Sequence, residues 1–146
     1  MKPIRLTFIL ILIGVVVVFL LPGRVSKTYV FAHPVEEIVS IDLLINTNDV
    51  GQANAGLLVR QRSLTQEEIT SFMSEIYGLE TRRCYPPLWG WGDYVAMVTY
   101  ANGDTELLGS ANIEFVPSGA STTGDGPYSF WHSGAFEAVF LQYMDS

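Results

Sequence analysis

The chain has 146 residues, which indicates a single domain, and a formal net charge of −7 at pH 7. All fifteen acidic residues but only six of the eight Lys and Arg residues follow residue 23, which gives that part of the chain a net charge of −9. Nucleic acids and anionic lipid headgroups bind positively charged protein surface. The charge balance therefore argues against both of them as partners.

Residues 6–21 form an uncharged apolar run, in which every residue except Thr7 and Gly14 is Leu, Ile, Val or Phe. At about −0.3 to −0.6 kcal/mol for each apolar residue, the run favours insertion into a bilayer by roughly 4–8 kcal/mol. As a helix it is about 24 Å long, slightly shorter than the ~30 Å hydrocarbon core of a membrane. We therefore predict an N-terminal transmembrane helix with the lipid bilayer as its partner.

The apolar run is either a retained signal-anchor or a cleaved signal peptide, and both need the positive charges of Lys2 and Arg5. The best cleavage pair, Val30 and Ala32, lies about ten residues beyond the run, which favours retention. Because acidic domains can be translocated regardless of their charge, we predict a single-pass cell-membrane protein with its C-terminal domain outside. Cleavage would instead make the protein secreted.

Residues 1–27 are accordingly assigned to the anchor and a short linker, and residues 28–146 to one extracytoplasmic domain. The length of this second part is sufficient for one hydrophobic core without covalent cross-links. Cys84 is the only cysteine, so no intramolecular disulfide can form. This fits a bacterial surface better than a eukaryotic secretory route.

A helix is expected to begin after Thr65. Thr65 and Glu68 have the spacing of a capping box, in which each side chain accepts a hydrogen bond from the other residue's backbone N–H. Gly78 suits the end of the helix. Apolar residues recur with helical spacing between these limits and predict a face that packs on a sheet. These residues are Ile69, Phe72, Met73 and Ile76.

Several strands are expected from alternating apolar residues and from turn signals. Asn102-Gly103 is a strong hairpin signal between two of them. The expected strands are 38–46, 57–62, 94–100, 105–108, 112–116 and a short one at 128–131. Val39, Ile41, Leu43 and Ile45 are expected to form the buried face of the first strand.

Ser133 is expected to cap a last helix, which carries Phe136, Val139, Phe140 and Tyr143 on one face. The order of elements predicts an α+β fold. In this fold, the transmembrane helix is followed by a small antiparallel sheet with two helices packed on one face.

Three short segments accompany the charged start and the apolar run: PVEEI at 34–38, LTQEEI at 64–69 and YANGD at 100–104. Together they resemble small membrane-anchored, exported proteins of Gram-positive bacteria. The resemblance covers most of the chain in layout. That group has no established activity, so the resemblance implies no functional residue.

Residues 79–93 are expected to form a long loop, and long loops are often functional. Trp, Tyr and Arg, which recur in this segment, are the residue types typical of binding hot spots. The candidate binding residues are Trp89, Trp91, Tyr85, Arg82 and Arg83. In the alternative interpretation, the two tryptophans fold inward and cap the core.

No segment predicts a catalytic, cofactor or metal site. His33 and His132 lie in no metal-ligand spacing with another His or Cys. The Gly- and Ser-rich segment 117–127 lacks the Gly-Lys-Ser/Thr ending of phosphate-binding loops. The segment that begins at Asn46 has Leu57 where a calcium loop needs Glu. We therefore assign no catalytic residue, metal or cofactor.

The function expected from the sequence is a non-catalytic, membrane-tethered extracytoplasmic module. The aromatic segment would bind an envelope protein or a glycan. Two alternatives stay open. One is a cell-envelope hydrolase with paired carboxylates, whose separation only a three-dimensional structure gives. The other is an accessory subunit of a membrane complex.

Overall fold

The computed structural model describes residues 26–28, 31–47, 57–122 and 124–145. The elements within these ranges are β1 (Ser26–Thr28), the 3-10 helix η2 (Val35–Glu37), β2 (Ile38–Asn46), β3 (Leu58–Ser63), α2 (Gln66–Tyr77), β4 (Glu80–Trp89), β5 (Tyr94–Tyr100), β6 (Thr105–Gly109), β7 (Ile113–Val116), β8 (Asp125–Phe130) and α3 (Ser133–Met144). The strands form one antiparallel sheet in the order β1-β4-β8-β7-β6-β5-β2-β3. This confirms the prediction of an α+β domain with an antiparallel sheet and two helices.

The predicted anchor at residues 6–21 lies outside the described residues. Within the described part, no helix has the length and apolar character needed to cross a membrane.

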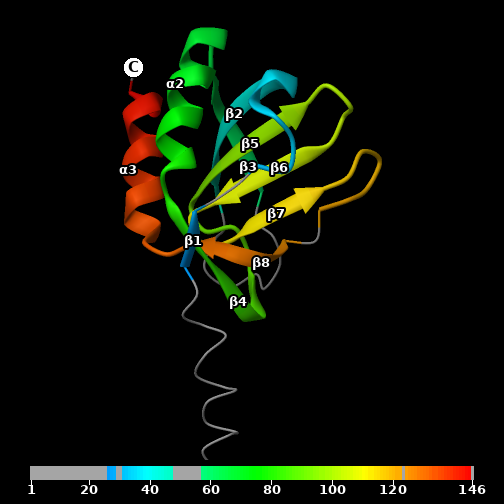
Figure 1. Cartoon of the computed structure of the whole chain (residues 1–146), viewed down its shortest axis with the longest axis vertical. Coiled ribbons are helices and arrows are strands. Elements are labelled where there is room, and N and C mark those ends of the chain that lie inside the picture. The colour runs from blue at the N-terminus through cyan, green and yellow to red at the C-terminus, as the bar shows by residue number, and fades with distance from the viewer. Residues whose placement is uncertain (1–25, 29–30, 48–56, 123, 146) are drawn as a thin grey trace, which may run out of the picture.

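The two helices lie side by side over the same face of the sheet (Figure 1). The capping box at the start of α2 is confirmed: the Glu68 N–H donates to Thr65 Oγ1 at 3.4 Å, and the Thr65 N–H donates to Glu68 Oε2 at 2.8 Å. The predicted apolar stripe of α2 is fully buried. Propensity, capping and tertiary packing therefore agree for this helix.

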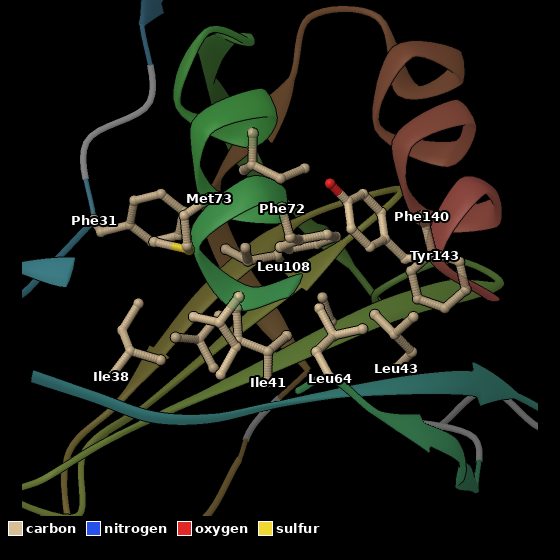
Figure 2. Packing of buried hydrophobic residues seen from close by; sticks show 14 of the residues in the cluster. Phe31, Ile38, Ile41, Leu43, Leu64, Phe72, Met73, Leu108, Phe140 and Tyr143 are labelled. Atoms are coloured by element: carbon tan, nitrogen blue, oxygen red, sulfur yellow. The ribbon is translucent and has the colours of Figure 1, made fainter. Parts of the chain in front are cut away.

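The main core lies between the helices and the sheet. Figure 2 shows Phe72 of α2 and Phe140 of α3 facing Ile41 and Leu43 of β2. All four side chains are 0% exposed. Each such burial contributes roughly 1.5–3 kcal/mol relative to exposure, so this layer supplies much of the driving force for folding.

The pleat of β2 differs from the predicted alternation. Val39 is 60% exposed, whereas Ile38 is buried. The register between β2 and β5 shifts between Ile38 and Ser40. A bulge of this kind adds one residue to a strand and reverses the side of the sheet on which the preceding residue lies. The prediction of a buried Val39 was therefore wrong, while Ile41 and Leu43 are buried as expected.

The opposite face of the sheet carries a second, smaller core, which covers the other side of β2 as well. Leu44 is buried although the alternation predicts exposure. A strand with two buried faces loses its alternating sequence pattern, which explains the difference. The buried members of this cluster are Leu44, Trp91, Val95, Leu107 and Val116.

The predicted loop at 79–93 is mostly a strand. β4 covers Glu80–Trp89 and pairs with β8 on one side and with β1 on the other. Its register with β8 shifts between Arg83 and Leu88, the stretch that contains Pro86 and Pro87. Proline cannot donate to the hydrogen-bond ladder and disfavours a strand assignment from sequence, but it is tolerated at such irregularities.

The start of α3 also differs from the prediction. The N-cap residue is His132, its side chain makes no capping hydrogen bond, and Ser133 is already helical. Phe136, Phe140 and Tyr143 are buried as expected. The apolar face of α3 was therefore predicted correctly, but the cap was not.

Candidate functional site

A cleft of about 340 Å³ lies where β4, β8, the turns after β4 and β6, and the first turns of α3 meet. This volume is close to the lower end of the range typical of small-ligand pockets. The polar and aromatic side chains that matter to its chemistry are Arg82, Asp93, Ser110, Ser129, Trp131 and Glu137. They come from five separate segments of the chain.

Arg82 is held in place from two directions. It lies opposite Ser129 across the β4–β8 ladder, and its Nε donates to Ser129 Oγ at 3.3 Å. Its guanidinium carbon is 5.5 Å from the centroid of the Trp131 ring. A cation–π contact at an exposed site contributes about 0.5–1 kcal/mol. Ser129 is itself buried, so it gives the arginine a rigid support.

The charged side chains of the cleft are not paired with one another. Among the described residues, ion pairs within 4.0 Å join His33 to Glu37 and Asp104, Arg60 to Asp42, and Arg62 to Glu68. Arg82, Asp93 and Glu137 take part in none of these pairs. The cleft therefore presents one guanidinium and two carboxylates to solvent or to a ligand.

Ser110 supplies a hydroxyl from a residue that is mostly buried. The residue is only 7% exposed, and its backbone N–H donates to the Tyr94 carbonyl at 3.0 Å. No described group hydrogen bonds its hydroxyl. A Cβ placed on Gly92 would lie 2.2 Å from Ser110 Oγ, and Gly92 has a φ of +84°. Both the space and the backbone conformation at position 92 thus require glycine.

The N-terminus of α3 also reaches the cleft, through Ser133. The first N–H groups of a helix have no partner within the helix and carry a partial positive charge. At α3 no side chain caps these groups, and no acidic residue lies in the first turn. The Ala135 N–H donates to the His132 carbonyl at 3.0 Å, which leaves the N–H groups of Ser133 and Gly134 without a described acceptor.

The predicted binding residues have different fates. Arg82 and the adjacent Arg83 are both exposed, but only Arg82 lines the cleft, because neighbouring residues of a strand point to opposite sides. Trp91 is 2% exposed, and its Nε1 donates to Glu114 Oε2 at 2.9 Å. It is a core residue, as in the alternative in which the tryptophans fold inward. The side chains of Tyr85 and Trp89 lie outside the described part.

The polar cluster around Asp104 is engaged internally. His33 Nε2 lies 2.8 Å from Asp104 Oδ2, and the Ser118 N–H donates to Asp104 Oδ1 at 2.8 Å. The Ser118 N–H, followed by His33, lowers the pKa of Asp104. In the described ranges, no group of three or more His, Cys, Asp or Glu side chains could hold a metal ion.

No family model, curated protein or solved structure matches this chain.

Sequence reasoning found only one of the six side chains that matter in the cleft. Ser110, Ser129, Trp131 and Glu137 follow no motif, and they lie up to 55 residues from Arg82 in the chain. Asp93 lies within the segment that was singled out, but nothing distinguished its carboxylate from the others. A cation–π pair and a hydroxyl that lines a cleft are three-dimensional features, so one sequence contains no signal for them.

Proposed function

We propose that this chain is a non-catalytic binding module, tethered to the cell membrane by residues 6–21 with its acidic domain outside, and that the cleft around Arg82 receives its ligand. The observation that supports the binding role is the arginine itself. Its guanidinium is fixed by Ser129 and Trp131, yet no described carboxylate neutralises it. Fixing a side chain before binding reduces the entropy that the complex would otherwise cost.

Retention of the anchor is supported by the segment that cleavage would remove. A cut after Ala32 would take away β1, which pairs with β4, and Phe31, which is 7% exposed in the main core. It would also remove the Ala32 N–H that donates to buried Glu106 Oε1 at 3.2 Å. Loss of a buried Phe side chain costs about 3–5 kcal/mol. A processed chain would therefore be much less stable than the intact one.

The binding role is tested on the full chain in non-ionic detergent, with acetate and inorganic phosphate as probes. Chemical shifts of the backbone N–H groups of Trp131 and Ser133, which line the cleft, report on the site by NMR. We expect saturable shifts that Arg82→Gln abolishes or weakens about tenfold or more, because a hydrogen bond to a charged group contributes about 1.5–3 kcal/mol. Arg83→Gln is the matched control and should leave the affinity unchanged. Equal effects of both variants would contradict the proposal.

The tether is tested separately in the source cell. We expect the full chain to stay in the membrane fraction after extraction at alkaline pH, with an N-terminus that still includes residues 6–21 by mass spectrometry. A soluble protein that begins at His33 would show that the segment is a cleaved signal and that the tether does not exist.

The hydrolase alternative has one supporting observation, since Asp93 and Glu137 line the same cleft. Glycoside hydrolysis needs two carboxyl groups on either side of the scissile bond. Release of a fluorophore from aryl glycosides, with loss of this release in both Asp93→Asn and Glu137→Gln, would favour the enzyme. Activity that persists in both variants would exclude this pair.

A further inference from the structure

Charges of both signs line one small cleft. The positive charge is Arg82 and the negative charges are Asp93 and Glu137. None of the three has an ion-pair partner among the described residues. A ligand that is only an anion would meet the two carboxylates as well as the arginine, on a chain whose net charge is −7. A ligand that carries both an anion and a cation would find a partner for each charge.

Three different donors are available for the anionic end. Arg82 offers guanidinium N–H groups, α3 offers backbone N–H groups at its uncapped start, and Ser110 offers its hydroxyl. Ser110 is 7% exposed and lines the cleft, and its hydroxyl makes no hydrogen bond to a described group. The hydroxyl is open to solvent in the cleft, so it is available to donate to a ligand oxygen.

The cationic end has Asp93 and Glu137. Neither carboxylate accepts a hydrogen bond from a described residue, so both are free to accept from an ammonium group, which has three N–H donors. Ammonium suits this pair of carboxylates better than a second guanidinium would, because the cleft is small and an ammonium is a compact charge.

The cleft is also close to the proposed anchor. Ser26 pairs with Arg82 across the β1–β4 ladder. Only five peptide steps separate Ser26 from the end of the apolar run at Leu21, which spans at most about 18 Å even when fully extended. If the anchor is retained, Arg82 lies near the headgroups of the outer leaflet.

We propose that the cleft binds a small zwitterion in which an oxyanion and a primary ammonium are separated by a few atoms, as in phosphoethanolamine. This inference rests on the proposed binding function of the same cleft. The zwitterion has two possible sources, a soluble metabolite or the headgroup of an aminophospholipid in the adjacent membrane.

The test compares phosphoethanolamine with methyl phosphate, which lacks the ammonium, and with ethylamine, which lacks the anion. Each is titrated into the full chain in non-ionic detergent, and the affinity is measured by NMR. We expect phosphoethanolamine to bind most tightly. Glu137→Gln should weaken phosphoethanolamine binding about two- to five-fold, the effect of losing one partly exposed charge pair, and should strengthen methyl phosphate binding. Glu67→Gln, on the exposed surface of α2, makes the same change in net charge and should leave the affinity for both probes unchanged.

The outcomes separate the two proposals. The zwitterion proposal is wrong, and the binding function stands, if methyl phosphate binds as tightly as phosphoethanolamine, if both depend on Arg82, and if Glu137→Gln strengthens the binding of both. If no probe binds in an Arg82-dependent way, both fail. Nanodiscs then identify the source of the zwitterion. If nanodiscs of phosphatidylethanolamine compete with soluble phosphoethanolamine and nanodiscs of phosphatidylglycerol do not, the ligand is the lipid headgroup. If neither kind of nanodisc competes, the ligand is the soluble zwitterion.

Discussion

Replacing Trp91 distinguishes a core residue from a binding residue. In the structure its ring packs with Leu44, Val95 and Leu107, and its Nε1 donates to buried Glu114. Truncation of a buried Trp to Ala costs about 3–5 kcal/mol. Loss of the hydrogen bond to a buried group adds about 1–3 kcal/mol. We therefore expect Trp91→Ala to lower the free energy of unfolding by roughly 4–8 kcal/mol. This is a large part of the about 5–15 kcal/mol by which a typical domain is stable.

Chemical denaturation of the full chain in detergent, followed by near-ultraviolet circular dichroism, measures this loss. Trp91→Phe is the matched variant, because it keeps an aromatic ring but removes the N–H that reaches Glu114. It should fall between the wild type and Trp91→Ala. If Trp91→Ala and the wild type unfold at the same denaturant concentration, the core assignment is wrong and Trp91 is a surface residue.

Three further predictions concern caps and protonation. Thr65→Ala should lower the free energy of unfolding by about 1 kcal/mol through loss of the capping box, as measured by urea unfolding. The pKa of Asp104 is lowered in the folded state, so the stability it contributes is present above the unfolded value of 3.8 and is lost as the pH falls through the folded value. Asp104→Asn should therefore flatten the acid limb of the melting temperature against pH. Burial, followed by the bond to Glu75, raises the pKa of Tyr143 to about 12 from 10.0. Its contribution is present below pH 10.0 and is lost towards about 12, so Tyr143→Phe should flatten the alkaline limb, and an unchanged limb would contradict this.

The elements that sequence predicted well carry their signals locally. The capping box at Thr65 and the buried stripe of α2 need only residues within one helix, so propensity and periodicity suffice. The hairpin between β5 and β6 likewise follows from Asn102-Gly103, whose glycine has a φ of +87°.

The elements that sequence predicted poorly depend on neighbours far along the chain. Leu44 looks exposed by alternation until the second core covers it, and Val39 looks buried until the bulge in β2 reverses its side. β4 looks like a loop because of its prolines, and only its pairing with β8 makes it a strand. Such pairings join residues that are 36 to 49 positions apart, and no local pattern encodes them.

Local sequence patterns were sufficient to predict the α+β class and the limits of α2, β2 and β5. Composition alone gives the acidic charge and the apolar run, for which we propose a membrane role. Only the folded chain shows that Trp91 is core, that Arg82 and Arg83 point apart, and that Arg82 lines one cleft with Ser129, Trp131 and the start of α3. The physical reason is the same in each case. Burial and a binding cleft are properties of groups that folding brings together from distant parts of the chain, whereas caps, turns and apolar periodicity are properties of residues that are already neighbours.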